Sequence, residues 1–452
     1  MRGEIVSYEP ATGMLLQKFR PYSETKIKEI IRKARKVQPA WVKDDKKRIM
    51  LMKNLAKMLK LNKIDIIMTV SQEIGTKKAD TYGIIDDLIQ AIRHYIKRYK
   101  AVKKIEYDST SEIRFYPVGV IGQMGVWNFP IWQTMITLIP ALLAGNTLVL
   151  KSSEYSTSSS FMIKELLRKA DFPDGVFDVI IGGGKEGAIL ARSDVDMIVF
   201  TGSVDTGKKI LSSCGLKKCL FEMSGNNAAI VCDDCDIKQA VEGVTWGSLF
   251  HSGEVCLRVK RIYVEKQIAK EFIELLKKKM KKEDTLKEIT PLIRPSAVKN
   301  LDRQIKALKK EGAKILYKCQ LPTKKKGFYH PHMLLKVSKK SKILPKEELF
   351  GPIVCVTEVK DWKEGIELAN NSCYGLGASV WTKNNSKGKE IADLLEAGNI
   401  WINDCCIPLT GGEYFYGWKD SGFSPSEERI KIFMKSKTIK NNKKCEKKDW
   451  WF

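Results

Sequence analysis

The spacing of hydrophobic positions changes along the chain. Between residues 23 and 99, hydrophobic side chains return every three or four positions, which is the period of a helix with one buried face. Ser23 precedes the first of these runs and has the hydroxyl of an N-cap residue. The pattern predicts three amphipathic helices: one that starts after Ser23, one over residues 49–59 and one over about residues 81–99.

From residue 118 onward, short hydrophobic runs alternate with helical ones. Strands are predicted at residues 118–124, 147–151, 176–181, 197–200 and 219–221. Helices are predicted between them, at residues 132–143, 158–170, 185–191 and 204–212. This alternation is typical of a doubly wound parallel sheet, a fold that often binds nucleotide cofactors.

A second α/β unit is expected from about residue 236 to residue 404, with strands at 259–264 and 353–359. Residues 112–116 alternate with the period of a short strand, and the basic segment that begins at Ile430 is also strand-like. These two segments lie outside both α/β units, so we expect them to form an arm and a tail.

The composition is that of a globular protein. The 452 residues exceed one ordinary core, and 43% of them are hydrophobic and 29% charged. No hydrophobic run is long enough to cross a membrane, and the first residues have no signal-peptide core, so we expect a cytoplasmic protein. The net charge of +26 comes from lysines spread along predicted helices, as at residues 275–282, which argues against specific nucleic-acid binding.

The 11 cysteines are interpreted as reduced thiols, as in cytosolic proteins of this size. Cys232 and Cys235 have the spacing of a zinc knuckle, with Cys214 and Cys219 upstream as candidate further ligands. Only one such close pair is present, so small buried thiols at the end of a strand are the preferred interpretation, and no metal site is predicted.

Cys256 is the cysteine best placed for chemistry, because it lies in a turn between a predicted helix and the strand at 259–264. A thiolate is a good nucleophile toward a carbonyl carbon, and a thiol is partly ionised near neutral pH. Three polar residues far apart in the sequence make sense around it: Asn128, Glu222 and Glu348. One thiol, one amide and two carboxylates suggest a site for redox acyl transfer.

Seven motifs then occur in one order: Trp127-Asn-Phe-Pro130, Lys151-Ser-Ser-Glu154, Phe200-Thr-Gly-Ser203, Glu222 with Ser224-Gly225, Gly253-x-x-Cys256, Glu348-Leu-Phe-Gly351 and Lys419-Asp-Ser-Gly422. Together they resemble the aldehyde dehydrogenase superfamily over nearly the whole chain. The resemblance implies an α/β fold with a Rossmann-like NAD-binding domain, a second α/β catalytic domain and a small oligomerisation arm. The expected boundaries are 1–107 and 117–231 for the first domain, 232–429 for the second, and 108–116 and 430–452 for the arm and tail.

For the chemistry, the resemblance implies that Cys256 attacks an aldehyde to form a thiohemiacetal and, after hydride transfer, carries a thioester. The Asn128 amide and the Cys256 backbone N–H would stabilise the oxyanion, and Glu222 would be the general base for hydrolysis. Taken singly, Asn128 could be a turn residue and Glu222 a structural carboxylate.

For the cofactor, the resemblance assigns Lys151 and Glu154 to the adenosine ribose, and an acidic residue there favours NAD over NADP. Gly202 and Ser203 precede a predicted helix whose first N–H groups would face the pyrophosphate. Three further residues complete the expected cofactor site: Glu348 at the nicotinamide ribose, Phe350 beside the ring, and Trp127. The arm and tail imply a homodimer or homotetramer.

Several alternatives remain open at this level. A succinate-semialdehyde-type enzyme would need an anchor for a carboxylate, and Arg258 is the candidate. A CoA-acylating enzyme would resolve the thioester with CoA, although the presence of Glu222 favours water. A scaffold or nucleic-acid-binding protein rests on charge alone. Trp132 and Phe250 are expected to flank a tunnel for a small aldehyde.

Overall fold

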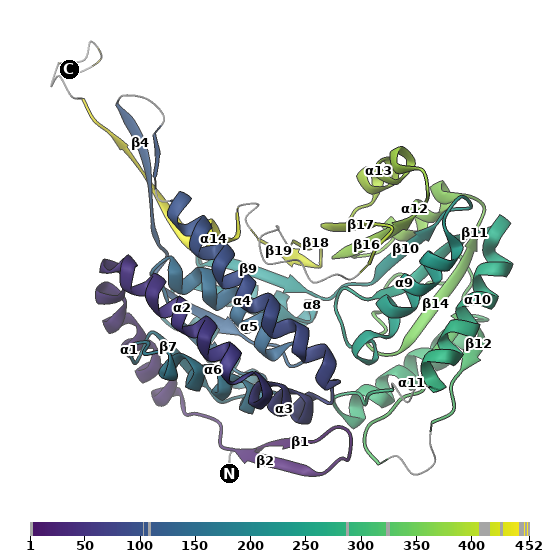
Figure 1. Ribbon diagram of the computed structural model, residues 1–452, viewed down its shortest axis with the longest axis horizontal. Helices are drawn as coiled ribbons and strands as arrows, with labels where there is room; N and C mark the ends of the chain where they lie inside the picture. The colour runs from purple at the N-terminus through teal and green to yellow at the C-terminus, as the bar shows by residue number, and fades with distance from the viewer. Residues whose placement is uncertain are drawn as a thin grey trace.

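The computed structural model describes residues 3–102, 104–106, 110–285, 289–321, 326–405, 416–424, 428–442, 447 and 450. Two α/β lobes lie side by side, and a narrow sheet projects beyond the first of them (Figure 1). The hairpin of β1 (Ile5–Tyr8) and β2 (Leu15–Phe19) lies below the lobes in the same view. The α/β class with parallel sheets predicted from the sequence is confirmed.

The helical part of the first lobe follows the predicted period. Its helices are α1 (Glu24–Lys43), α2 (Asp45–Leu61), α3 (Lys63–Ile74) and α4 (Lys78–Ala101). Ser23 is the N-cap of α1, since its hydroxyl accepts a hydrogen bond from the Lys26 N–H at 3.1 Å. Helix α3 was not predicted separately. It follows α2 after Asn62 alone, so one hydrophobic pattern runs across both.

The sheet of the first lobe has six strands in the order β19-β9-β8-β5-β6-β7. They are β5 (Val120–Met124), β6 (Thr147–Lys151), β7 (Phe177–Ile180), β8 (Met197–Gly202), β9 (Lys218–Met223) and β19 (Gly422–Phe423). All neighbours are parallel except β19 and β9. The connecting helices are α5 (Pro130–Leu143), α6 (Thr157–Lys169), α7 (Gly184–Arg192) and α8 (Val204–Leu211).

Helices cover both faces of this sheet, and alternate strand residues point to opposite faces. Leu148 and Leu150 join the core shared with α4, α5 and α6, whereas Val149 joins the core shared with α1 and α7. Every residue of β6 is therefore buried. The near-continuous hydrophobic runs noted in the sequence are the consequence of this two-sided burial.

The second lobe contains a seven-stranded sheet in the order β12-β13-β14-β11-β10-β16-β17. Its strands are β10 (Asn227–Val231), β11 (Val259–Glu265), β12 (Lys314–Lys318), β13 (Met333–Lys336), β14 (Ile353–Val359), β16 (Gly377–Trp381) and β17 (Asn399–Ile402). Its helices are α9 (Ile237–Leu249), α10 (Lys266–Thr285), α11 (Pro295–Lys310), α12 (Trp362–Asn370) and α13 (Asn385–Leu394). Only β12 pairs antiparallel with its neighbour.

Sheet membership differs from the predicted domain boundaries at two strands. Strand β10 belongs to the second lobe although the boundary was expected after residue 231, and β19 returns to the first lobe from within 232–429. The chain thus crosses between the lobes over the three residues from Ser224 to Asn226. The domain assignment itself stays a prediction.

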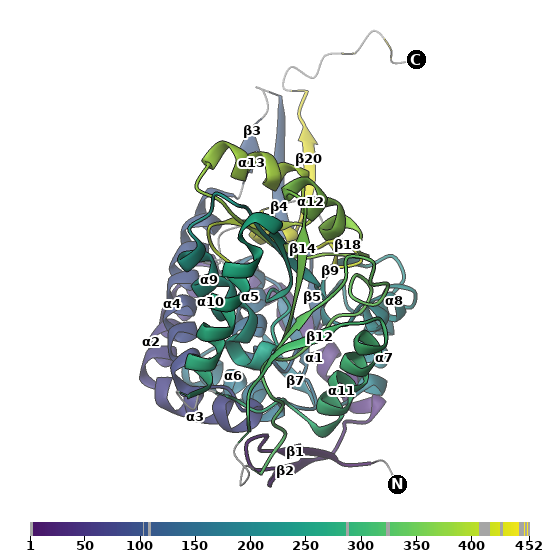
Figure 2. The ribbon, with the colours of Figure 1, turned by 90° about the vertical axis from the view of Figure 1, so that its right-hand side faces the viewer.

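The projecting sheet consists of β3 (Lys104–Glu106), β4 (Ser111–Pro117) and β20 (Met434–Lys440), which follows the short helix α14 (Arg429–Ile432) (Figures 1 and 2). The resemblance implied that the arm strand at 112–116 and the tail that begins at Ile430 would contact a neighbouring subunit. Instead, β20 pairs with the full length of β4 in the same chain. The two strands satisfy each other's backbone groups, so any subunit contact would have to use the outer edges.

Candidate active site

The predicted cofactor and oxyanion residues of the first lobe share one edge of its sheet. Lys151 ends β6, Gly202 ends β8, and Asn128 lies in the loop that follows β5, which is the strand between them. The carboxyl ends of neighbouring parallel strands meet at one edge, which is where ligands bind in doubly wound folds. The structure therefore brings these three residues to a common edge, as the motifs predicted.

Asn128 connects this edge to the turn that holds Cys256 in the second lobe. Its Nδ2 donates a hydrogen bond of 2.9 Å to the carbonyl of Glu254, two residues before Cys256. The carbonyl of Cys256 in turn accepts a 2.7 Å hydrogen bond from Asn227 Nδ2, at the start of β10. The thiol and the amide that the sequence selected are thus part of one hydrogen-bonded region.

The backbone before Cys256 is strained. The short helix η1 (Phe250–Gly253) contains two non-glycine residues in the left-handed region, His251 (φ 51°) and Ser252 (φ 48°), followed by Gly253 (φ 70°). A Cβ atom at Gly253 would lie 2.3 Å from the carbonyl oxygen of Gly351, so only glycine fits. Left-handed residues with side chains each cost about 1–2 kcal/mol, and such strain concentrates at functional sites.

The surroundings of Cys256 act against ionisation of its thiol. Burial raises the pKa of Cys256 to about 11, because the charged thiolate is poorly solvated there. The ammonium of Lys260 acts against this increase, and the carboxylates of Glu348 and Glu222 add to it. Burial thus opposes the partial ionisation that the sequence led us to expect, and it outweighs the nearby cation.

Lys260, which the sequence analysis did not select, lies directly behind Cys256. It is fully buried, and its Nζ lies 2.8 Å from the Cys256 carbonyl oxygen and 2.8 Å from Glu348 Oε1. It also donates to the Gly225 carbonyl. Burial lowers the pKa of Lys260, and Glu348 opposes that effect. Charged residues inside the fully buried strand β11, Lys260 among them, were the signal that could have revealed it.

Glu222 lies in β9 and is held at both of its carboxylate oxygens. Its side chain is buried, with 5% of the residue exposed. Arg429 Nη2 lies 3.1 Å from Glu222 Oε1, and Gln133 Nε2 donates to Glu222 Oε2. The sequence analysis missed both partners. Nothing in the local sequence around Glu222 points to them, because they come from α14 and α5.

The predicted ribose and pyrophosphate residues form a polar corner of the first lobe. Lys151 Nζ lies 3.5 Å from Glu154 Oε2, and burial lowers the pKa of Lys151 while Glu154 opposes this. Ser203 is the N-cap of α8 and accepts a 3.4 Å hydrogen bond from the Thr206 N–H. A Cβ atom at Gly202 would lie 2.7 Å from the ring of Phe200. A close backbone approach next to a helix N-terminus suits a pyrophosphate.

The predicted nicotinamide residues meet across the two lobes. The rings of Trp127 and Phe350 contact each other edge to face, with their centroids 5.9 Å apart. Glu348 lies beside them and is fixed by its ion pair with Lys260. The structure thus brings together Trp127, Glu348 and Phe350, and their mixed aromatic and acidic character suits a nicotinamide riboside.

Aromatic residues also extend from this region toward the surface. Phe250 stacks against Trp246 with ring centroids 5.0 Å apart and against Phe129 at 6.4 Å, and Trp246 is 45% exposed. The place of Phe250 beside a tunnel stays a prediction. Trp132 packs against the large core of the first lobe.

Two polar residues near Cys256 are structural. Arg258 is fully buried, and its guanidinium donates to the carbonyls of Val259, Leu349 and Ile353. It cannot anchor a substrate carboxylate, so that candidate role is wrong. Glu254 is also buried, and burial raises the pKa of its carboxyl well above the usual range.

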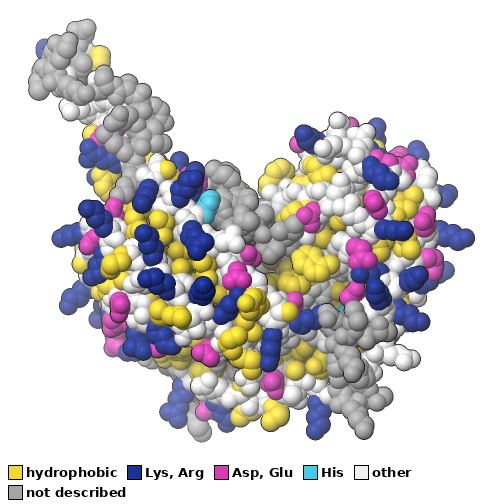
Figure 3. All heavy atoms as spheres, viewed as in Figure 1, with side chains coloured by type: hydrophobic (Ala, Val, Ile, Leu, Met, Phe, Trp, Pro, Cys, Tyr) yellow, Lys and Arg dark blue, Asp and Glu magenta, His cyan; other side chains and the backbone are white. Residues whose placement is uncertain are grey.

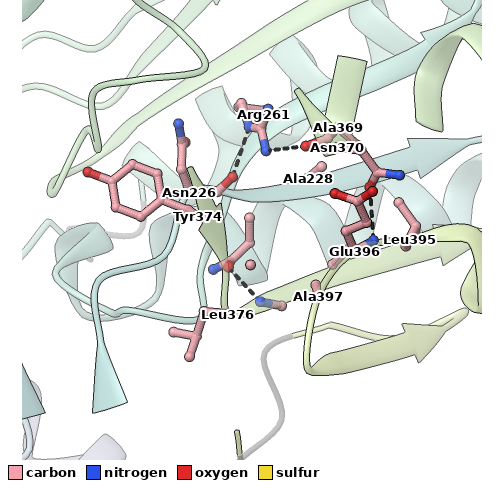
Figure 4. A pocket seen from close by; sticks show the side chains of 14 residues that line it. Asn226, Ala228, Arg261, Ala369, Asn370, Tyr374, Leu376, Leu395, Glu396 and Ala397 are labelled. Atoms are coloured by element: carbon pink, nitrogen blue, oxygen red, sulfur yellow. Dashed lines mark hydrogen bonds between the residues drawn. The ribbon is translucent and has the colours of Figure 1, made fainter. Parts of the chain in front are cut away.

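The remaining features add no chemistry. Among the described residues, no group of three or more histidines, cysteines or acids could hold a metal ion, and no helix is long and apolar enough to span a membrane. Lys and Arg are dispersed among Asp and Glu over the face in Figure 3. A pocket in the second lobe has its polar groups bonded to one another, as where Arg261 donates to the Asn226 carbonyl at 2.8 Å (Figure 4).

Comparison with known proteins gives a consistent result. A sequence profile of the aldehyde dehydrogenase family matches residues 2–440. Betaine aldehyde dehydrogenase of Bacillus subtilis (strain 168) is 31% identical over 419 residues, which are 88% of this chain and 85% of that protein. The 4-trimethylaminobutyraldehyde dehydrogenase of Mus musculus is 30% identical over 445 residues, which are 94% of this chain and 90% of that protein.

Solved structures agree with the sequence relatives. The crystal structure of betaine aldehyde dehydrogenase from Staphylococcus aureus in complex with NAD+ has a TM-score of 0.93 and 26% identity, and the match covers 99% of this chain and 93% of that one. PnpE from Pseudomonas sp. WBC-3 has a TM-score of 0.90 and 28% identity, with 97% and 94% covered. These matches include both lobes and the turn between them. The chain therefore belongs to the aldehyde dehydrogenase family, and it is an NAD(P)-dependent aldehyde oxidoreductase.

Proposed function

We propose that the protein oxidises an aldehyde to the free carboxylic acid, with Cys256 as nucleophile, Asn128 as oxyanion donor, Glu222 as general base and NAD as hydride acceptor. The observation that carries the proposal is the hydrogen bond between Asn128 of the first lobe and the Glu254 carbonyl. That bond joins the amide to the turn of Cys256. Family membership and the S. aureus complex with NAD+ support the cofactor.

The Asn128 amide is suited to the oxyanion role. An amide NH2 has two donors, and the Glu254 carbonyl takes one of them. This bond fixes the orientation of the amide and leaves its second N–H for the substrate oxygen. A donor fixed before the reaction stabilises the negative charge of the thiohemiacetal without further reorganisation, and its removal typically costs about a hundredfold to a thousandfold in rate.

Cys256 has to lose its proton before or during attack on the aldehyde. The buried ammonium of Lys260 favours the thiolate, and the thiol proton passes to solvent. As the sulfur bonds to the aldehyde carbon, the negative charge moves to the carbonyl oxygen. The bond from sulfur to the carbonyl carbon then holds the substrate for hydride loss, which leaves a thioester on Cys256. Water next attacks the thioester carbon while Glu222 accepts the proton.

NAD, when bound, accepts the hydride from the substrate carbon. The residues that would hold it are Lys151 and Glu154 at the adenosine ribose, Gly202 and Ser203 at the pyrophosphate, and Glu348, Phe350 and Trp127 at the nicotinamide riboside. The polar corner, the helix start and the aromatic pair all fit these parts. Because Glu154 is acidic, we expect it to disfavour the 2′-phosphate of NADP.

The experiment that tests the proposal is NADH formation with a panel of aldehydes. The panel comprises short aliphatic, aromatic, ω-carboxylated and trimethylammonium aldehydes, the last because the two sequence relatives described above are named for them. Cys256→Ala should abolish turnover and retain NAD binding, whereas Cys373→Ala, at an exposed cysteine, should retain activity. Turnover by Cys256→Ala would exclude Cys256 as the nucleophile.

Two finer expectations belong to the same proposal. Product analysis should find the free acid, and formation of an acyl-CoA in the presence of CoA would favour the acylating alternative. We also propose a dimer or a dimer of dimers that uses the outer edges of the arm sheet, and light scattering at micromolar concentration tests it. A cytoplasmic location stays a prediction from the sequence.

A further inference from the structure

The carboxylate of Glu222 is held by two side chains that lie outside the family motifs quoted above. Arg429 meets Oε1 at 3.1 Å, and Gln133 donates to Oε2. We propose that Arg429 is a positioning residue for thioester hydrolysis: it holds Glu222 as an ionised carboxylate by Oε1, so that Oε2 can exchange Gln133 for the attacking water. The inference rests on the proposed function, because it assigns Arg429 a task in the step of Glu222.

Burial makes the cation necessary. Glu222 is 5% exposed and Arg429 is 8% exposed. A carboxyl group in such surroundings is driven toward its neutral form when no positive charge accompanies it. A neutral carboxylic acid cannot accept a proton from water, so the base would be lost. Burial alone would lower the pKa of Arg429, but Glu222 and the surrounding groups raise it overall, and the guanidinium stays charged.

Arg429 is itself anchored in the first lobe. It begins α14, in which Ile430 and Ile432 are buried in the main core of that lobe. The preceding residue, Glu428, is paired with Arg98 of α4 at 2.5 Å. The residues on both sides of Arg429 thus anchor its backbone, and the guanidinium can stay in place while it holds Glu222.

Gln133 is the hydrogen-bond partner that Glu222 can exchange for water. The same Nε2 that donates to Glu222 also lies 3.1 Å from Thr201 Oγ1. When water displaces Gln133 from Glu222 Oε2, the amide therefore keeps a hydrogen bond to Thr201. A neutral hydrogen bond with a ready alternative is weaker than a bond to a guanidinium, so Oε2 is the oxygen that becomes available.

Hydrolysis of the thioester returns Glu222 and Cys256 to their starting states. The oxygen of water bonds to the thioester carbon, and one proton of the water passes to Glu222 Oε2. The carbon–sulfur bond breaks, the carboxylic acid leaves, and Cys256 becomes a thiolate. The proton on Glu222 passes to that thiolate, which restores both the thiol and the ion pair with Arg429.

The test compares Arg429→Met and Arg429→Lys with the unaltered enzyme in rapid-mixing assays with NAD and aldehyde. Arg429→Met should keep the first burst of NADH, because hydride transfer precedes hydrolysis. Its steady-state rate should fall by about tenfold to a hundredfold, and Arg429→Lys should recover part of that loss. In the Glu222→Gln background, Arg429→Met should cause no further loss, because Arg429 acts through Glu222.

The pH profile gives a readout that a merely structural role would not change. In Arg429→Met, the acid limb of the steady-state rate should move to higher pH, because the isolated carboxyl group of Glu222 loses its counter-charge. Among the described residues, the titratable groups that act on the pair include Cys256, Tyr95 and Tyr416. They are present in both enzymes, so the shift reports on Arg429.

Three outcomes would overturn the inference. One is an unchanged steady-state rate in Arg429→Met, and another is an equal loss of burst and steady state in a folded variant. The third outcome applies if Arg429→Met does not fold. Arg429→Lys then tests the inference, and a reduced burst of NADH in that variant would overturn it. Absence of NADH formation by the unaltered enzyme with every aldehyde would instead refute the proposed function, and that result is obtained before any variant is made.

Discussion

Two buried ion pairs near Cys256 differ in how their cations are satisfied. Lys260 is paired with Glu348 at 2.8 Å, and its ammonium also donates to the backbone carbonyls of Gly225 and Cys256. Arg429 is paired with Glu222 at 3.1 Å, through side chains only. The Lys260 ammonium thus contacts Gly225, where the chain crosses between the lobes, Cys256 in the catalytic turn, and Glu348 of the proposed cofactor site. The second cation holds the residue proposed as base.

This difference suggests a division between a fixed and an exchangeable half of the site. Removing the Lys260 ammonium would take a donor from the Gly225 carbonyl, whereas the Cys256 carbonyl would keep its hydrogen bond from Asn227. A buried carbonyl left without a donor costs about 1–3 kcal/mol. Glu222 can exchange one oxygen while Arg429 retains the other. We therefore expect rigidity beside Glu348 and mobility beside Glu222, and four measurements can break or sharpen that contrast.

Of these four measurements, the largest effect on turnover is expected for Glu222→Gln. The amide cannot take a proton from water, so the steady-state rate should fall by about a hundredfold to ten-thousandfold while the first burst of NADH remains. Rapid-mixing absorbance measurements separate the two phases. Loss of the burst together with turnover would mean that Glu222 acts earlier, in the activation of Cys256.

Breaking the fixed pair should destabilise the folded protein. Lys260→Met leaves Glu348 buried without its cation, so the free energy of unfolding should decrease by about 3–5 kcal/mol. Thermal and denaturant unfolding measure this change. Lys277→Met, which removes the exposed pair with Glu274, is the matched control and should unfold like the unaltered protein. Equal free energies of unfolding for Lys260→Met and Lys277→Met would contradict the proposed difference between the two buried ion pairs.

The ionisation of Cys256 shows whether burial or the Lys260 ammonium has the larger effect on the pKa of its thiol. With a pKa of about 11, the thiolate fraction should increase about tenfold for each pH unit until that value is approached. The rate of alkylation by iodoacetamide, corrected with Cys256→Ala for the other cysteines, measures this fraction. A rate that is already constant near about pH 8 would mean that Lys260 outweighs burial.

The smallest effect is expected at the adenosine end. Glu154→Gln removes the negative charge proposed to face the 2′-phosphate, so the ratio of kcat/KM for NADP to that for NAD should rise by about tenfold. Steady-state kinetics with both cofactors at matched concentrations measure the ratio. An unaltered ratio would show that Glu154 does not discriminate between the cofactors.

Much of the fold was accessible from local sequence. The strand and helix alternation from residue 118 was confirmed because each run is buried on one or both faces and keeps the corresponding period. The N-cap at Ser23 was confirmed because a cap depends on neighbouring residues only. The pairing of β4 with β20 was missed, since two exposed strands more than three hundred residues apart contain no local mark of their partner.

The same division holds for the active site. The sequence by itself determined that a nucleophilic thiol, an amide and two carboxylates stand in family order, because their motifs are local. Only the tertiary structure decided that Arg258 faces backbone carbonyls, that Lys260 lies behind Cys256 and that Arg429 meets Glu222. Burial, direction and long-range pairing set the charge of each group, and these arise only when the two lobes pack together.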